Sequence, residues 1–207
     1  MKPYYQDDSV TIYNNDCLEV MKEFNDKQFD LCLTDPPYGI KADKMQMGSG
    51  EHRWNKSVCG WDHNTPIKEY FTELFRISKN QVIWGGNYFT NILPPSKHWL
   101  IWDKLNPNLS FAEAEMAWVY KGKRVRLFKK YVANQIKYHP TQKPECLMTW
   151  VLSKYTKEDD VIIDPYLGSG TTARACKDLG RKCIGIEISK EYCDIAVKRL
   201  GQEVLQF

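Results

Sequence analysis

The sequence predicts an α/β fold with a seven-stranded, mostly parallel sheet and helices on both faces. Short apolar runs alternate with longer amphipathic stretches along the 207 residues, a pattern typical of parallel sheets covered on both sides. The composition agrees, since 43% of the residues are hydrophobic and 27% are charged, as in ordinary globular proteins. A chain of this length can bury one sizeable core, so we expect a single domain over residues 1–207.

Seven runs rich in Ile, Val, Leu and aromatic residues are the expected strands. In chain order they are Val10–Tyr13, Phe29–Thr34, Gln81–Trp84, Trp99–Trp102, Met116–Tyr120, Val161–Ile163 and Cys183–Glu187.

Four helices are indicated by residues typical of helix ends. Thr65-Pro66 and Pro144 open two of them, a third ends before Gly180, and Ser189 is a suitable N-cap for the last. The faces expected to point inward carry Ile67, Tyr70, Phe71 and Leu74 in the first, Leu147, Trp150 and Val151 in the second, and Ile195, Ala196 and Leu200 in the last. The longest connection, residues 41–64, has a length usual for functional or disordered loops.

Cysteine spacing and hydropathy favour a cytoplasmic protein. Seven cysteines are scattered without the Cys-x-x-Cys spacing of zinc or redox sites, so we expect reduced thiols and no metal site. No apolar run approaches the roughly 20 residues that cross a bilayer, and the N-terminal residues lack the apolar stretch of a signal peptide. We therefore expect neither a membrane span nor a leader.

The net charge of +3 comes from one local segment. Residues 121–144 carry eight basic and no acidic side chains, whereas acidic residues outnumber basic ones over residues 1–40. Phe128, Tyr131 and Tyr138 lie among these cations. Cations interleaved with aromatic rings are typical of nucleic-acid interfaces, and a solvated surface run is the alternative.

The segment Asp35-Pro36-Pro37-Tyr38 directly follows an expected strand. Two consecutive prolines fix the backbone and leave two residues without N–H donors, so the Asp35 carboxylate and the carbonyls form a rigid set of acceptors. Beside the flat ring of Tyr38, such acceptors suit a planar group with an exocyclic amine, which is a nucleobase such as adenine or cytosine. A rigid strand-to-loop turn with an N-capping aspartate is the alternative.

A second constellation runs from Val161 to Ala173 and comprises a strand, a glycine turn and a helix start. Glycines let a ligand approach the backbone and the helix N-terminus closely. The next strand ends in Glu187, where a carboxylate can accept hydrogen bonds from ribose hydroxyls. Such a unit binds a nucleoside-containing cofactor, and a nicotinamide dehydrogenase is a rival interpretation, because Gly168, Gly170 and Ala173 also satisfy the dinucleotide fingerprint.

The two constellations together resemble those of the DNA amino-methyltransferases, the enzymes of restriction–modification systems that methylate adenine N6 or cytosine N4 with S-adenosylmethionine. Asp35–Tyr38 resembles their catalytic motif and Asp164–Thr172 their cofactor motif, in the order of the permuted beta arrangement. Other segments that resemble family positions are residues 15–21, 102–104, 114–118 and 139–144. The resemblance spans nearly the whole chain and implies a Rossmann-like methyltransferase fold.

The resemblance implies S-adenosylmethionine as the cofactor and a set of residues around it. Asp16 would accept from the adenine amine with the Cys17 backbone beside it, and Glu187 would bind the ribose. The remaining expected cofactor contacts are Asp164, Tyr166, Gly168, Ser169, Gly170, Thr171, Thr172, Ile188 and Lys143. For Lys143, which would pair with the cofactor's carboxylate, a surface lysine beside a helix start is the alternative.

The expected catalytic residues are Asp35, Pro36, Pro37 and Tyr38. Asp35 and the Pro36 carbonyl would accept the hydrogens of the amine and free its lone pair. Tyr38 would stack on a base that has left the duplex. Because the sulfonium is already activated, neither a metal nor a covalent intermediate is required, and positioning supplies most of the acceleration.

We expect a site-specific methyltransferase acting on adenine N6 in double-stranded DNA, with cytosine N4 as the close alternative. An RNA or protein-glutamine methyltransferase and a non-catalytic nucleic-acid-binding protein are more remote. Family members commonly carry a larger target-recognition region, whereas here only residues 41–64 and 121–138 are free for DNA contacts. A short site or a homodimer would accommodate this deficit. The expected DNA contacts are Lys121, Lys123, Arg124, Arg126, Lys129, Lys130 and Arg53.

Overall fold

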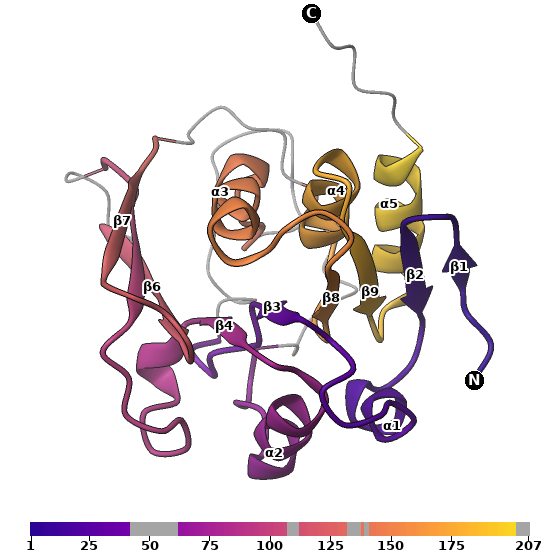
Figure 1. Ribbon diagram of the computed structural model, residues 1–207, viewed down its shortest axis with the longest axis horizontal. Coiled ribbons are helices and arrows are strands. Elements are labelled where there is room, and N and C mark those ends of the chain that lie inside the picture. The colour runs from indigo at the N-terminus through magenta and orange to yellow at the C-terminus, as the bar shows by residue number, and fades with distance from the viewer. Residues whose placement is uncertain (42–61, 107–111, 132–137, 139–140, 202–207) are drawn as a thin grey trace, which may run out of the picture.

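The structure, a computed structural model, describes residues 1–41, 62–106, 112–131, 138 and 141–201. In these ranges nine strands form one sheet in the order β1-β2-β9-β8-β3-β4-β6-β5-β7 (Figure 1). The strands are β1 (Tyr5–Gln6), β2 (Val10–Tyr13), β3 (Leu31–Thr34), β4 (Gln81–Trp84), β5 (Trp99–Asp103), β6 (Ala114–Val119), β7 (Arg126–Lys129), β8 (Val161–Asp164) and β9 (Lys182–Ile186). The predicted α/β fold with a mostly parallel sheet is confirmed, although the sheet has nine strands rather than seven.

The two strands that the sequence did not predict lie at the two edges of the sheet. β1 has only two residues, too few to show an alternating pattern. β7 lies within the basic segment, where Arg126 and Phe128 are half-buried and Leu127 and Lys129 are exposed. The Phe128 ring packs on Trp150, with ring centroids 5.3 Å apart. The segment 121–138, expected to be free for DNA contacts, therefore contributes β7 to the sheet, because the packing of Phe128 outweighs the high charge.

Helices cover both faces of the sheet, with α3, α4 and α5 on one face and α1 and α2 on the other (Figure 1). They are α1 (Cys17–Lys22), α2 (Lys68–Ile77), α3 (Glu145–Tyr155), α4 (Thr171–Asp178) and α5 (Lys190–Leu200), with a 3₁₀ turn at Gly86–Tyr88. Four of these helices were predicted, and Ser189 caps α5 by accepting from the Tyr192 N–H. Ile67, expected to point inward, is 58% exposed because it precedes α2 as its N-cap residue.

The chain adds strands towards opposite sides of the sheet after β3 and after β8, although both strands run in the same direction. β2, β9, β8, β3 and β4 run parallel to one another. From β3 the chain passes through α2 to β4 on one side, and from β8 it passes through α4 to β9 on the other. Such a divergence leaves a crevice at the carboxyl ends of the two strands. Both predicted motifs follow these ends.

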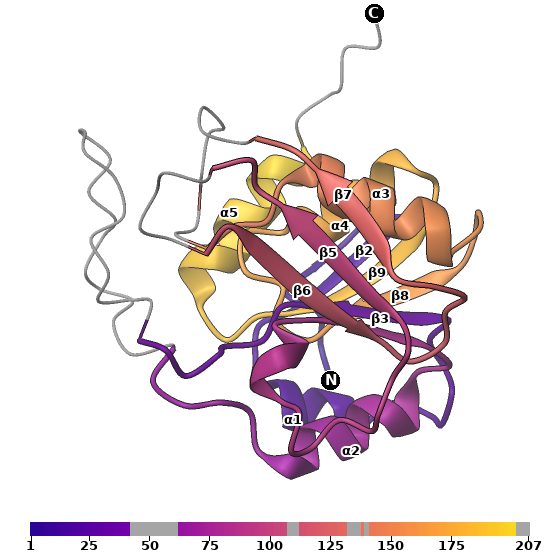
Figure 2. The ribbon, with the colours of Figure 1, turned by 90° about the vertical axis from the view of Figure 1, so that its left-hand side faces the viewer.

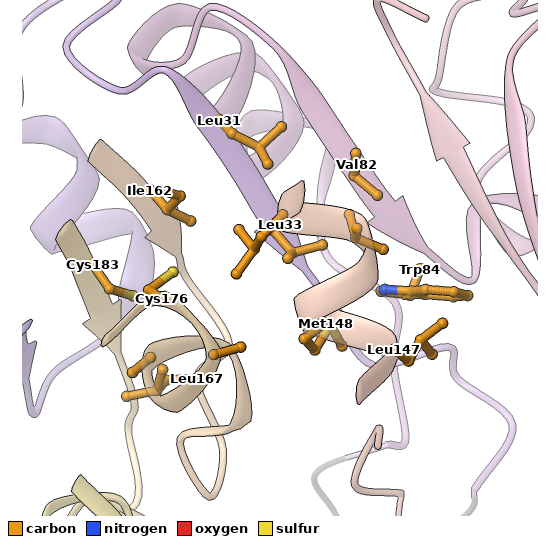
Figure 3. Close-up of a cluster of buried hydrophobic side chains, with 14 of the residues drawn as sticks. Leu31, Leu33, Val82, Trp84, Leu147, Met148, Ile162, Leu167, Cys176 and Cys183 are labelled. Carbon is orange, nitrogen blue, oxygen red and sulfur yellow. The ribbon is translucent and has the colours of Figure 1, made fainter. Parts of the chain in front are cut away.

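The core has two layers, one on each face of the sheet. Leu31, Leu33 and Trp84 belong to the layer beneath α3 and α4 (Figure 3), and Phe71 and Leu74 belong to the layer between the sheet and α2. All four residues of β3 are buried, as expected for a central parallel strand. The strand that carries the first motif is therefore held rigidly from both sides.

We predict that Leu33→Ala lowers the free energy of unfolding by about 2–5 kcal/mol, because it leaves a cavity in the β3 layer. Leu33 is completely buried. The matched control is Leu127→Ala on β7, where the side chain is 52% exposed, and its cost should be much smaller. Urea unfolding of both variants measures the difference, and equal costs would contradict the described packing.

Candidate active site

One cavity, about 230 Å³ in volume, brings the two predicted constellations together. It lies at the carboxyl ends of β3, β8 and β9. The predicted residues that line it are Asp35 and Pro37 from the first motif, Asp164, Tyr166, Gly168, Ser169, Thr171 and Thr172 from the second, and Lys143, Glu187 and Ile188. Residues more than 120 positions apart in the sequence therefore face one space. Pro36, Tyr38, Asp16, Cys17 and Gly170 do not line this cavity.

Both carboxylate oxygens of Asp35 are held by neighbouring side chains. The Tyr38 hydroxyl donates to Oδ1, and the Lys143 ammonium donates to Oδ2 at 2.5 Å. Burial raises the pKa of Asp35, while the charge of Lys143 opposes that shift. The turn after Asp35 is itself anchored, because Asp62 accepts from the Tyr38 and Gly39 backbone N–H groups at 2.6 and 2.9 Å.

The Tyr38 ring is packed rather than open on all sides. It stacks on Tyr88 with centroids 4.8 Å apart and an angle of 13° between the rings. At Gly85, a Cβ atom would lie only 2.0 Å from the Tyr38 ring, so only glycine leaves room for it. In this arrangement the ring places its hydroxyl on Asp35, and the outer Tyr88 ring is 43% exposed.

Lys143 is a buried ion-pair partner, which excludes the alternative of a surface lysine. Its side chain is 4% exposed and contacts Asp35 at 2.5 Å and Glu115 at 2.9 Å. Burial opposes the ammonium charge, but the two carboxylates together raise the pKa of Lys143. Its ammonium also lies 5.8 Å from the centroid of the Trp84 ring. The sequence predicted a cofactor contact, and the structure places Lys143 in the wall of the cavity with its ammonium between Asp35 and Glu115.

The glycine turn and Glu187 form a cradle of the kind that a nucleoside needs. Gly168 and Ser189 donate their backbone N–H groups to Glu187 Oε2 and Oε1 at 2.9 and 2.8 Å. Each oxygen keeps a second lone pair for a ligand hydroxyl. A Cβ at Gly168 would meet no atom within 4 Å, so the turn faces open space. These residues fit a ribose-bearing cofactor.

Asp16 and Cys17 lie at the end of β2, beside the second motif. Asp16 caps α1, with Oδ1 accepting from the Leu18 N–H at 2.8 Å. Cys17 neighbours Tyr166, and burial raises the pKa of its thiol to about 11. The thiol is therefore protonated at neutral pH, as expected for a reduced cysteine.

Comparison with known proteins agrees with the resemblance seen in the sequence. A family model described as DNA methylase matches residues 86–198. The type II methyltransferase M.HinfI of Haemophilus influenzae is 30% identical, over 98% of this chain and 71% of its own length. The crystal structure of the M1.HpyAVI–SAM complex is 28% identical, with a TM-score of 0.63 over 93% of this chain and 100% of that one.

The chain belongs to the DNA methylase family. The predicted resemblance to the DNA amino-methyltransferases is thereby confirmed, and with it the Rossmann-like methyltransferase fold. The cytosine-N4-specific PvuII DNA methyltransferase has a TM-score of 0.68 over 99% of this chain and 91% of its own, at 16% identity. That likeness concerns the fold alone.

Several residues that line the cavity escaped prediction. Thr141, Gln142, Met148, Leu167, Ser189 and Tyr192 also line the cavity. Gln142 Oε1 accepts from Ser169 Oγ at 3.1 Å, and its place in the segment 139–144 was a usable indication. Glu115, which reaches Lys143, lies in the segment 114–118 that resembles the family. Met148 and Tyr192 lie on helices, and no local pattern distinguishes them from core residues.

The predicted DNA contacts of the methylase separate into two groups. β7 runs parallel to β5, which is antiparallel to β6, and β6 is antiparallel to β4. Lys129 and Lys130 follow one another at the carboxyl end of β7. They therefore lie at the same end of the strands as the cavity.

The other cations are farther from the cavity. Lys121 lies at the opposite end of the strands, where its backbone bonds the Asn80 side chain before β4. Lys123 and Arg124 belong to the connection between β6 and β7, two strands that lie on either side of β5 (Figure 2). Arg126 begins β7, and Arg53 lies outside the described residues, as does most of the loop 41–64.

Metal ligands and membrane spans were searched among the described residues. There, no three His, Cys, Asp or Glu side chains gather in a way that could hold a metal ion. In the same ranges, no helix combines the length and the apolar character needed to cross a membrane.

We predict that Asp164→Asn becomes more stable relative to the wild type as the pH rises. Burial raises the pKa of Asp164 from 3.8 to about 7, against hydrogen bonds from the Thr172 side chain and the Tyr166 backbone. The folded state thus binds this proton more tightly than the unfolded state, and ionisation costs stability between about pH 4 and about pH 7. Asparagine stays neutral and can still accept from Tyr166.

Thermal unfolding at about pH 5 and about pH 8 measures this change. The stability difference between Asp164→Asn and the wild type should grow towards the higher pH. A difference independent of pH would show that Asp164 does not titrate in this range.

Proposed function

We propose that the protein is a site-specific DNA methyltransferase that modifies the exocyclic N6 of an adenine flipped out of the duplex. Its family and relatives are DNA methylases, and S-adenosylmethionine is the cofactor, in line with the related M1.HpyAVI–SAM complex. The single observation that carries methyl transfer to an exocyclic amine is the shared cavity, in which Asp35 faces the same space as Gly168 and Glu187.

The cofactor residues have distinct roles in this proposal. Glu187, oriented by two backbone N–H groups, binds the ribose hydroxyls. Asp16 accepts from the adenine amine of the cofactor beside Cys17. The turn and helix start, Asp164, Tyr166, Gly168, Ser169, Gly170, Thr171 and Thr172, surround its methionine end, with Ile188 beside Glu187. When bound, S-adenosylmethionine supplies an electrophilic sulfonium methyl group.

Asp35 prepares the amine of the target base. The lone pair of an aromatic amine is delocalised into the ring, and acceptors on both hydrogens draw the nitrogen towards tetrahedral geometry and free that pair. Asp35 and the Pro36 carbonyl are these acceptors, and Pro36 and Pro37 keep them rigid. The carboxylate also favours the positive charge that grows on nitrogen, and it takes the released proton or passes it to water.

The position of the cavity supports base flipping. Asp35 lies in a recess at the end of β3, and the amine of a paired base is engaged inside the duplex, so the base has to leave the stack to reach it. Tyr38 and the exposed Tyr88 form a stacked aromatic pair beside Asp35, and we propose this pair as the surface against which the flipped base lies.

In this proposal, DNA approaches the carboxyl ends of the strands, where the cavity lies. Lys129 and Lys130 are exposed there, and we propose that they contact phosphates. The other cations contribute less in this proposal, since they lie at or towards the opposite end of the strands. They are Lys121, Lys123, Arg124 and Arg126. Action as one domain over residues 1–207 and formation of a homodimer stay predictions.

We predict that the purified protein converts adenine in duplex DNA to N6-methyladenine and that Asp35→Ala abolishes this activity while cofactor binding persists. Labelled S-adenosylmethionine with duplex DNA, RNA and protein, followed by nucleoside analysis, identifies the acceptor. Label in N4-methylcytosine would replace adenine by the cytosine alternative, and label only in RNA or protein would refute the DNA assignment. Full activity of Asp35→Ala would refute its catalytic role.

We predict that Lys129→Ala with Lys130→Ala weakens DNA binding and flattens its salt dependence. Each lost phosphate contact should reduce the slope of log affinity against log salt concentration by about 0.9. The matched control is Lys123→Ala with Arg124→Ala, which removes two cations of the same segment towards the opposite end of the strands. Fluorescence anisotropy over a salt series measures both, and a larger effect of the control pair would contradict the proposed direction of approach.

A further inference from the structure

Four charged side chains form a continuous, largely buried row that begins in the wall of the cavity. Asp35 Oδ2 contacts Lys143 at 2.5 Å, Lys143 contacts Glu115 Oε2 at 2.9 Å, and Glu115 Oε1 contacts Lys104 at 2.6 Å. Lys143 is the most deeply buried member, and Glu115 and Lys104 are about four-fifths buried. These residues come from the end of β3, the segment before α3, β6 and the end of β5.

The presence of Lys143 beside Asp35 poses an electrostatic problem for amine methylation. The reaction places positive charge on the target nitrogen, and a catalytic carboxylate accelerates it only if its charge acts on that nitrogen. An unshared lysine at 2.5 Å would neutralise Asp35 and would itself repel the growing charge. Charges in a buried site interact strongly, because little water screens them.

Glu115 resolves this problem because it forms a second ion pair with the Lys143 ammonium. With Glu115 present, the charges alternate in sign along the row, so that the row is neutral overall and its negative end, Asp35, lies at the cavity. Without Glu115, the three remaining charges would sum to one positive charge. The fourth charge, Lys104, contacts the far oxygen Oε1 of Glu115. Glu115 also fixes the position of Lys143, which in turn fixes the orientation of the Asp35 carboxylate.

We propose that Glu115 is a positioning residue for methyl transfer, which holds the Lys143 ammonium between itself and Asp35 so that the catalytic carboxylate keeps its orientation and its negative charge. The inference rests on the proposed role of Asp35 in amine methylation. Glu115 itself need not touch either the base or the cofactor, since it does not line the cavity.

Other titratable groups also face Asp35, and they determine the expected pH dependence. Tyr38 donates to Oδ1 from the following turn, and Asp164 interacts with Asp35 from the end of β8. After burial, the Lys143 charge lowers the pKa of Asp35 and the Glu115 charge raises it. Removal of Glu115 should therefore move the titration of Asp35 to lower pH, and removal of Lys143 should move it to higher pH.

The test compares Glu115→Gln with Glu113→Gln, an exposed glutamate two residues earlier. Under single-turnover conditions with bound cofactor and duplex DNA, Glu115→Gln should lower the methylation rate on the order of ten-fold or more. The affinities for cofactor and DNA should stay close to those of the wild type, and the acidic limb of the rate–pH profile should move to lower pH. Glu113→Gln should resemble the wild type.

Two further variants separate positioning from a structural role. Glu115→Asp keeps the charge with a shorter reach and should restore part of the rate, and it supplies the test if Glu115→Gln does not fold. Carboxyl ¹³C NMR, with the Asp35 signal assigned through Asp35→Asn, should show its titration midpoint falling in Glu115→Gln and rising in Lys143→Met.

Unchanged rate and pH profile in Glu115→Gln would overturn the proposal. Losses of stability and of both affinities that account for the whole loss of rate would also overturn it, since they indicate a structural role. A wild-type protein that methylates no DNA base would instead contradict the proposed function, and the NMR titrations, which need no activity, would still show whether Glu115 and Lys143 act on Asp35 in opposite directions.

Discussion

The adjacency of β3 and β8 is the constraint on which the rest of this structure depends. The two strands pair in parallel, with Leu31 opposite Ile162 and Cys32 opposite Ile163, so that their carboxyl ends stop at nearly the same level. An aspartate-proline pair stands at the end of each strand, with Asp35 directly after β3 and Asp164 as the last residue of β8. Because the chain leaves the two strands in opposite directions, no connection crosses the space between the motifs, and the cavity forms there.

The cost of burying charge shapes the site as strongly as the topology does. Asp35 and Lys143 lie where water is scarce, and an isolated charge there would cost several kcal/mol. A hydrogen bond and two ion pairs offset that cost. The Tyr38 hydroxyl donates to Asp35, Glu115 pairs with Lys143, and Lys104 pairs with Glu115. The same arrangement determines how much negative charge faces the cavity, so the stability of the site and its chemistry depend on one set of contacts.

The chain shares its architecture with other methylases, but that likeness does not explain the choice of base. A cytosine-N4-specific enzyme shares the fold at 16% identity, and the acceptors around Asp35 suit either amine. The fold alone therefore does not decide between adenine and cytosine. The short basic strand β7 also shows that a segment rich in charge can form part of the sheet.

The sequence by itself determined the fold class, seven of the nine strands, the family, and the residues of both motifs, because strand periodicity, proline pairs and glycine turns act locally. It did not determine β7, whose Phe128 is held by Trp150, or the exposure of Ile67 ahead of α2. Only the tertiary structure decided that Lys143 is shared by Asp35 and Glu115. It also decided that Lys129 lies at the end of the strands that carries the cavity and Lys123 towards the opposite end. These facts depend on which strands are neighbours and in which direction they run, and long-range packing decides that.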